Sequence, residues 1–348
     1  MTWTGSPTER LSVQRDGEAA VERAAALLGA GFLVAFPTET VYGLGALGLH
    51  VAAVQRIFAA KERPASDPLI LHVGTVEEVE GLVTRVPDRA RLLMATYWPG
   101  PLSLVLRRAA RVPDCVTAGL DSVAVRMPAH PTALSLLRRV GAPVAAPSAN
   151  LFSHTSPTTA EHVLADLDGR IEAVLDDGPT PLGVESTVLD LRGDEPVLLR
   201  PGGVSHAHLE HILGCTVCGP ALVPDSAGFR SPGLLTRHYS PRTPLWLFAG
   251  QDAATLARMS RTAAGALGSV GLLLCTEDLP EFTDLNARCF DLGPRAHPEQ
   301  IAHRLYDGLR TLDGAGVTAI LARLVPRGGL GDAINDRLVR AAAGEIQS

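Results

Sequence analysis

Residues 18–46 read EAAVERAAALLGAGFLVAFPTETVYGLGA, and they contain the three kinds of segment from which the rest of the fold is built. Over residues 18–30 apolar side chains recur at helical spacing, and glycines typical of a helix end follow. The short apolar run Phe32–Phe36 stops at Pro37, which predicts a buried strand. Hydroxyls and glycines then follow at residues 37–46, where an α/β sheet binds ligands. An ordinary threonine- and glycine-containing turn would explain this loop equally well.

Helical and strand-like segments continue to alternate through residues 1–218. We expect further helices at residues 50–60, 76–83, 87–97, 131–140 and 158–167. We expect further strands at residues 69–73, 102–106, 122–127, 143–146, 171–175, 186–191 and 196–199. Strands and helices interleaved in this way predict an α/β or mixed α+β layered domain.

A second, smaller domain is expected at residues 244–348. Strands are expected at residues 244–249, 269–275 and 317–325, with a helical stretch between the first two, and helices at residues 297–313 and 332–343. This pattern predicts a doubly wound, Rossmann-like α/β sheet, although no G-x-G-x-x-G follows its first strand, so a dinucleotide site is not expected there. Residues 219–243 between the domains are rich in Pro, Gly and Ser and are longer than a connection of about 4–6 residues. Such a segment is either a mobile tether or a lid, and because it includes Arg237, His238 and Tyr239 we favour a linker that acts as a lid.

Composition and charge exclude several classes of protein. The 348 residues are 46% hydrophobic and 20% charged, which excludes a mostly disordered chain. A formal net charge of −6 gives no standing cationic surface for nucleic acid or an anionic membrane. We find no run of about 18 apolar residues, so no membrane span is expected. The odd number of cysteines, 5, favours free thiols and a cytoplasmic protein, with Cys215 and Cys218 at a metal-like spacing but without a partner pair.

Lys61 is the only lysine in the chain, and Arg63 follows it before Pro64 ends the helix. An ammonium group and a planar guanidinium so close together suit a polyphosphate. Cations at a helix end also complement the helix dipole, but arginine would serve that purpose equally well.

Other candidate residues lie at the ends of predicted strands. Arg126 ends an alternating strand and could bind a carboxylate in bidentate fashion, or form a surface ion pair. Ser148 and Asn150 alternate after the strand at 143–146, and Ser186 and Arg200 lie at the ends of later strands. The Walker, kinase, G-x-S-x-G and H-E-x-x-H patterns are absent from the sequence.

Taken together, these segments resemble the YrdC-type threonylcarbamoyl-AMP synthases in their long form, which adds a second domain after a linker. The resemblance is carried, in order, by FPTETVYGLGA (36–46), AKERP and DPLILHV (60–73), WPGPLSLVL (98–106), SVAVRMP (122–128), APSAN (146–150), SPTTAEHVLADL (156–167), GVESTVLDL (183–191), LLRPGG (198–203), SPG and RHYSP (231–241) and GLGDAINDRL (329–338).

The resemblance implies a twisted mixed sheet with helices in the first domain and a Rossmann-like second domain. It implies that ATP, L-threonine and bicarbonate (or CO2) are joined into L-threonylcarbamoyladenylate with release of pyrophosphate. A separate transferase then uses this product on tRNAs that read ANN codons. Mg2+ would accompany ATP, and no tightly bound organic cofactor is expected. Contact with the transferase would be transient, contact with tRNA weak or indirect, and no membrane would take part.

The same resemblance assigns roles to residues. The residues expected to hold L-threonine are Thr40, His72, Arg126 and Ser186. The catalytic residues expected around the reacting phosphate are Lys61, Arg63, Ser148 and Asn150. The residues expected to contact ATP are Lys61, Arg63, Asp67, Ser122, Ala146 (through its backbone), Ser148, Ser156, Arg200 and, from the lid, Tyr239. No residue is expected to ligate a metal.

Three departures from the family pattern and two other functions stay open. Asp67 replaces a common Asn and would sit awkwardly beside phosphate unless it faces the ribose or the base. Asp177 replaces a glycine, and Leu235 and Thr236 replace a basic residue and a tyrosine. A double-stranded RNA-binding module is one alternative, against which the negative charge and the 4% aromatic content count. A carbamoyltransferase acting on carbamoyl phosphate is the other, but the additional domains of such enzymes are missing.

Overall fold

The computed structural model describes residues 7–219, 238–249, 253–282, 287–344 and 346–347. The chain forms two compact units, which are described separately below. The first unit comprises residues 1–152, 156–181 and 185–234, and the second comprises residues 153–155, 182–184 and 235–348. Within the described ranges, no helix combines the length and the apolar character that a membrane crossing needs. All five cysteines lie in these ranges and are free thiols, as the sequence predicted.

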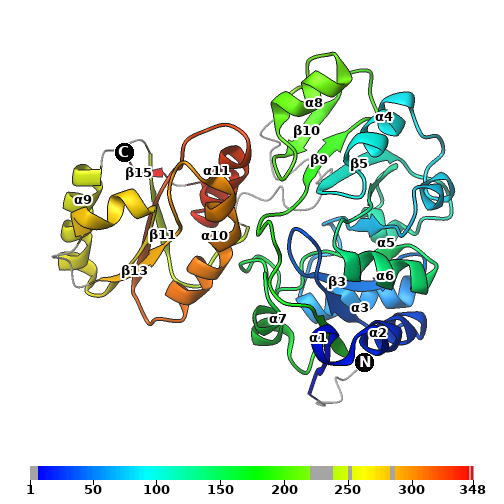
Figure 1. Cartoon of the computed structure of the whole chain (residues 1–348), viewed down its shortest axis with the longest axis horizontal. Helices are drawn as coiled ribbons and strands as arrows, with labels where there is room; N and C mark the ends of the chain where they lie inside the picture. Colours follow the sequence, from blue (N-terminus) through cyan, green and yellow to red (C-terminus); the bar gives the residue numbers. More distant parts are fainter. Residues whose placement is uncertain (1–6, 220–237, 250–252, 283–286, 345, 348) are drawn as a thin grey trace. The chain divides into compact units, whose positions relative to one another are not determined.

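The first unit contains a ten-stranded sheet and helices on both of its faces (Figure 1). Its strands are β1 (Glu9–Ser12), β2 (Val34–Phe36), β3 (Gly43–Leu47), β4 (Ile70–His72), β5 (Leu102–Arg107), β6 (Ser122–Arg126), β7 (Val144–Ala145), β8 (Ala173–Asp176), β9 (Thr187–Asp190) and β10 (Val197–Arg200). Its helices are α1 (Val13–Asp16), α2 (Glu18–Gly29), α3 (Val51–Lys61), the 3-10 helix η1 (Glu77–Gly81), α4 (Asp88–Tyr97), α5 (Asp114–Thr117), α6 (Pro131–Val140), α7 (Ala160–Leu167) and α8 (His206–Leu213).

This sheet contains both parallel and antiparallel pairs, and its strand order is β1-β8-β2-β3-β7-β4-β6-β5-β9-β10. The expected mixed sheet is therefore confirmed. Strand β2 shows how the sheet separates two cores, because successive side chains point to opposite faces. Val34 and Phe36 pack with α2 and α6, whereas Leu33 and Ala35 belong to the larger core of α3, α4, α5, α7 and α8. This double burial explains the uninterrupted apolar run in the sequence.

Two expectations about the local structure need correction. Residues 43–46, expected as part of a loop, belong to β3, which pairs antiparallel with β2 and β7. Glycine is required at Gly45, because a Cβ atom there would lie 2.9 Å from Cε1 of Phe36. The expected helix at 76–83 is a short 3-10 helix instead. The short strand β1 and the helix α8 were not predicted at all.

The second unit is a five-stranded parallel sheet with strand order β13-β12-β14-β11-β15. Its elements are β11 (Leu245–Phe248), α9 (Ala253–Leu267), β12 (Val270–Leu274), η3 (Thr276–Phe282), β13 (Arg288–Asp291), α10 (Pro298–Asp313), β14 (Ala319–Arg323), α11 (Leu330–Ala341) and β15 (Ile346–Gln347). Helix α9 lies on one side of the sheet, and α10 and α11 lie on the other (Figure 1). This arrangement confirms the expected Rossmann-like class.

Most of the expected linker, including Leu235, Thr236 and Arg237, lies outside the described residues. His238 and Tyr239 are described and belong to the second unit. Both side chains are buried, Tyr239 has a left-handed backbone with φ 59°, and its ring lies 6.0 Å from that of Tyr306. The guanidinium of Arg337 lies 5.2 Å from the centre of the Tyr239 ring. The proposed domain boundaries at 218/219 and 243/244 stay predictions.

Candidate active site

Four strands of the first unit bring polar side chains to one end of a shared face. His72 and Arg126 are paired neighbours at the ends of the parallel strands β4 and β6. Each lies two residues after a member of a small apolar cluster, Ile70 on β4 and Ala124 on β6, and so on the same face of the sheet. The other members of this cluster are Val105, Val188 and Leu199. Since side chains alternate along a strand, Ser103 on β5 and Ser186 just before β9 extend the same face. The sheet register thus gathers residues that are far apart in sequence.

Thr40 is held by a tight turn that follows β2. The Thr38 hydroxyl accepts hydrogen bonds from the backbone N–H groups of Thr40 and Val41, at 3.1 and 3.3 Å. It also donates to the carbonyl oxygen of Val41 and lies 2.8 Å from the Thr40 hydroxyl. Side-chain hydroxyls commonly replace backbone hydrogen bonds in this way within turns. Thr38 therefore fixes the position at which Thr40 meets Arg126.

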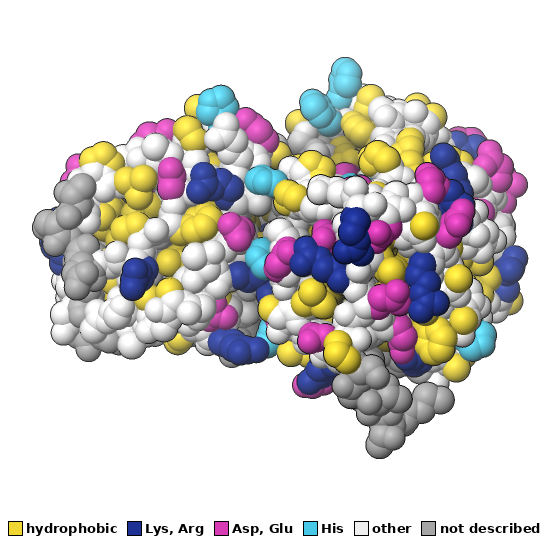
Figure 2. Space-filling view, turned by 60° about the horizontal axis from the view of Figure 1, so that its bottom comes forward, with side chains coloured by type: hydrophobic (Ala, Val, Ile, Leu, Met, Phe, Trp, Pro, Cys, Tyr) yellow, Lys and Arg dark blue, Asp and Glu magenta, His cyan; other side chains and the backbone are white. Residues whose placement is uncertain are grey.

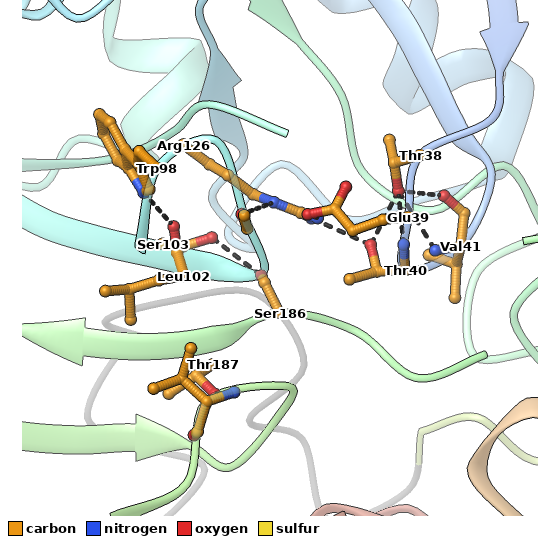
Figure 3. A network of polar contacts seen from close by, with 12 residues as sticks. Thr38, Glu39, Thr40, Val41, Trp98, Leu102, Ser103, Arg126, Ser186 and Thr187 are labelled. Carbon is orange, nitrogen blue, oxygen red and sulfur yellow. Dashed lines mark hydrogen bonds and ion pairs between the residues drawn. The ribbon is translucent and has the colours of Figure 1, made fainter. Parts of the chain in front are cut away.

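The guanidinium of Arg126 is the centre of this polar group (Figure 3). Its Nε donates to the carbonyl oxygen of Gly100 at 3.3 Å, and its Nη1 donates to the Thr40 hydroxyl at 3.0 Å. Its Nη2 lies 2.7 Å from Oε1 of Glu39, an ion pair in which the Arg126 side chain is 4% exposed and that of Glu39 13%. A buried guanidinium fixed at three positions suits the oriented binding of a carboxylate.

Ser186 joins this group to Arg200. The hydroxyls of Ser186 and Ser103 lie 2.8 Å apart. Arg200, at the end of β10, donates to the backbone oxygen of Ser186 at 3.0 Å and reaches its hydroxyl at 3.2 Å. The structure therefore brings together all four residues expected to hold threonine, since His72 neighbours Arg126 and Ser186 lies beside Ser103.

His72 is a neutral side chain in this site. Burial and, after it, the nearby positive charge of Arg126 together lower its pKa to about 3. A neutral imidazole can donate one hydrogen bond and accept another without adding charge. Of the residues expected to hold threonine, Arg126 is thus the one that carries a positive charge.

Lys61, the last residue of α3, forms a second polar group with Arg63 and Asp67. The Lys61 ammonium donates to the carbonyl oxygen of Ser148 at 2.5 Å and to that of Asn150. The side chain is almost fully buried, and its desolvation, followed by repulsion from Arg63, lowers its pKa. Lys61 therefore positions the loop that carries two other predicted catalytic residues, as well as supplying charge.

The structure explains how Asp67 is accommodated beside these cations. Its Oδ2 lies 2.9 Å from Nη2 of Arg63, and both side chains are buried. Burial raises the pKa of Asp67, while the charges of Arg63, Lys61 and Arg200 act in the opposite direction. Arg63 also donates to the carbonyl oxygen of Pro68 at 2.9 Å. The Asp67 carboxylate is thus already paired with one of the predicted cations.

The remaining predicted residues are spread more widely. Ala146 and Asn150 are buried near the end of β7, and the Ser156 hydroxyl donates to Oε1 of Glu185 at 2.5 Å. Ser122 begins the strand that Arg126 ends, so the two residues lie at opposite ends of β6. Tyr239 belongs to the second unit, and its contact with ATP stays a prediction.

Sequence reasoning assigned no role to Thr38, Glu39, Ser103 or Glu185. Thr38 and Glu39 could have been found from the sequence, because they directly precede Thr40 in the loop at residues 37–46. The contact of Thr38 with Thr40 lies within the turn, whereas the contact of Glu39 with Arg126 depends on β6, which is distant in the sequence. In the described ranges, no three His, Cys, Asp or Glu side chains are grouped as a metal site.

Two family models together match most of the chain. Residues 26–202 match a family model described as "Telomere recombination", and residues 204–343 match one described as "Threonylcarbamoyl-AMP synthase, C-terminal domain". A threonylcarbamoyl-AMP synthase of Bacillus subtilis is 42% identical over 346 residues, which cover 99% of this chain and 98% of the relative. The chain belongs to the threonylcarbamoyl-AMP synthase family.

Two archaeal comparisons extend this assignment to the whole fold. A threonylcarbamoyl-AMP synthase of Pyrococcus abyssi is 42% identical, with 96% of this chain and 97% of the relative covered. The crystal structure of Pyrococcus abyssi Sua5 complexed with L-threonine has a TM-score of 0.90 and 40% identity. That match covers 98% of this chain and 99% of the solved one. The similarity to named synthases therefore extends over nearly the full length of this chain.

Proposed function

We propose that this chain joins L-threonine, bicarbonate (or CO2) and ATP into L-threonylcarbamoyladenylate and releases pyrophosphate. This reaction is the first step in the threonylcarbamoyladenosine modification of tRNAs that read ANN codons. The observation that carries the proposal is the buried Arg126 with its fixed contacts, in the same unit as the buried cations Lys61 and Arg63. A sequence identity of 42% to two named synthases, over nearly the full length of the chain, supports the proposal independently.

The amino acid binds through its carboxylate to Arg126, with Thr40, His72 and Ser186 around it. Its amine nitrogen forms a bond to the carbon of CO2 and loses a proton, which yields a carbamate. A carbamate oxygen then forms a bond to the α-phosphorus of ATP, and the bond from that phosphorus to the bridging oxygen of pyrophosphate breaks. Negative charge gathers on phosphate oxygens, so positioned cations and donors provide most of the stabilisation.

The residues proposed to stabilise that charge are Lys61, Arg63, Ser148, Asn150 and Arg200. Asp67, Ser122, Ala146 and Ser156 are proposed to contact ATP elsewhere along its length. Tyr239 would close over the nucleotide as part of a lid, because a buried aromatic next to a long linker can exclude water when it moves. Mg2+ is proposed to enter with ATP, bound by phosphates and water.

The product carries an activated carbamoyl group, so a separate transferase must consume it. We propose a transient contact with that transferase, only weak or indirect contact with tRNA, and a cytoplasmic location. The net charge of −6 supports weak rather than tight binding of RNA.

Pyrophosphate release from ATP, with threonine and bicarbonate each present or omitted, tests the reaction. We expect release to require both substrates, and serine to be a poorer substitute for threonine. ATP turnover that is indifferent to threonine would contradict the proposal.

A further inference from the structure

Glu39 is the one acidic side chain among the described residues that touches the Arg126 guanidinium. It lies between Thr38 and Thr40 in the turn after β2, and its carboxylate points toward Arg126 (Figure 3). Oε1 approaches Nη2 of Arg126 to 2.7 Å, but the angles are not those of a hydrogen bond. Neither carboxylate oxygen of Glu39 has a hydrogen-bond partner among the described residues, and neither has Nη2. Two acceptor oxygens of Glu39 and one donor nitrogen of Arg126 are therefore buried without hydrogen bonds. Burying such groups costs free energy of folding, and a ligand that bonds to them would recover that cost.

The charges of this pair restrict what can bind. Arg126 and Glu39 together are neutral, and His72 beside them is neutral as well, because burial holds its pKa far below the ordinary value. The neighbouring His130 also has its pKa lowered by burial, and Asp177 near it accepts a hydrogen bond from Thr132 at 2.5 Å. A ligand that brought only a carboxylate would add an uncompensated negative charge to a buried site. A ligand that brought one charge of each sign would not.

A free α-amino acid is such a ligand, because its carboxylate and ammonium groups are joined through one carbon atom. We propose that Glu39 binds the α-ammonium group of the amino acid substrate, while Arg126 binds its carboxylate. The ion pair then acts as a receptor for a zwitterion and selects α-amino acids over the corresponding α-hydroxy acids. This inference rests on the proposed function, since it takes the threonine site to be the one built around Arg126.

Replacement of Glu39 by Gln separates this role from a structural one, because two ligands should respond with opposite signs. L-Threonine loses its partner for the ammonium group and should bind at least about tenfold more weakly. The α-hydroxy acid analogue, in which a hydroxyl replaces the ammonium group, should bind more tightly, because Arg126 is no longer neutralised. Isothermal titration calorimetry of both ligands with the full chain measures the two affinities. Glu39→Asp, which keeps the charge, should retain the preference for threonine in part.

Glu22→Gln is the matched control, because Glu22 lies on α2 and pairs with Arg139 at the surface. This variant should change neither affinity, and the affinity of every variant for ATP should stay that of the unchanged chain. Equal weakening of both ligands by Glu39→Gln would overturn the inference, and so would an unchanged affinity for threonine. If the unchanged chain releases pyrophosphate with threonine but Glu39→Gln gives either of those results, the inference alone fails. If the unchanged chain neither binds nor uses threonine, the proposed function fails first.

Discussion

The ammonium group of Lys61 is held by two backbone carbonyl oxygens, of Ser148 and Asn150, in a nearly water-free position. An arginine at this position could not reach the same place, because its planar fork is larger and directs its donors differently. This geometry gives a physical reason for a lysine rather than an arginine at position 61, although every other basic residue among the 31 Lys and Arg residues is an arginine. The lysine both carries charge toward the phosphates and fixes the loop beside them.

We therefore predict that Lys61→Met lowers the rate of pyrophosphate release at least about 100-fold, since one positioned donor to developing charge is typically worth that much. The free energy of unfolding should change by no more than about 2 kcal/mol, because methionine replaces a buried charge with an apolar group of similar length. Arg23→Met, which removes a surface cation paired with Glu9, is the control and should leave activity unchanged. Full activity in Lys61→Met would refute the role given to Lys61.

His72 makes the stability of the first unit depend on pH. Its pKa is lowered to about 3 by burial in the folded state, against an ordinary value of about 6.5 when unfolded. Between these values the unfolded chain binds a proton that the folded chain does not. The contribution of His72 to stability is therefore fully present above about pH 6.5 and is lost as the pH falls.

We predict that the free energy of unfolding loses about 1.4 kcal/mol per pH unit through His72 below about pH 6. Urea unfolding of the unchanged chain and of His72→Asn at about pH 7, 6 and 5 measures this, and the difference between the two should shrink as the pH falls. Parallel curves for the two proteins would show that His72 is not the group responsible.

At the scale of elements, the site depends on how closely the turn after β10 approaches the start of β9. A Cβ atom on Gly202 would lie 2.2 Å from the backbone nitrogen of Thr187 and 2.4 Å from the carbonyl carbon of Ser186. Both are backbone atoms, which cannot rotate away. Glycine at this position therefore keeps Ser186 beside Ser103 and Arg200.

We predict that Gly202→Ala lowers the free energy of unfolding by about 3 kcal/mol and weakens threonine binding, since β9 must move to make room. Gly193→Ala serves as the control, because the nearest atom to its Cβ would be 3.9 Å away. That variant should stay within about 0.5 kcal/mol of the unchanged chain. Equal stability of the two variants in urea unfolding would contradict the close approach.

At the scale of the whole molecule, the distribution of charge argues against an RNA-binding module. The formal net charge is −6, and Figure 2 shows basic and acidic side chains interspersed on the face in view, without a continuous basic surface. Tight binding of RNA backbones needs many phosphates to be neutralised at once. The buried cations Lys61 and Arg63 are enclosed by protein and suit a small polyphosphate better than a helix of RNA.

We predict that tRNA and double-stranded RNA bind with a Kd weaker than about 10⁻⁶ M at about 0.15 M salt, the range of non-specific binding. Fluorescence anisotropy over a series of salt concentrations measures this. A Kd below that range, together with an affinity that falls steeply as salt is added, would support the RNA-binding alternative instead.

The amino-acid sequence by itself determined the elements in which the pattern of apolar residues is regular from end to end. The helix at 18–30, the strand at 32–36 and the long helix at 297–313 all appear close to their expected bounds, because local periodicity records which face is buried. Ordered motifs also pointed to the family and to the residues that gather around Arg126.

Tertiary structure alone decided which partners those residues have. Strand β3 is rich in glycine and has little strand propensity of its own, so β2 and β7 define it. Glu39 pairs with Arg126, and Lys61 donates to the carbonyl oxygens of Ser148 and Asn150. The partners in each of these contacts are at least 87 residues apart in the sequence. Such contacts form only when distant strands come into register, and a sequence pattern read over a few turns or strands does not contain that register.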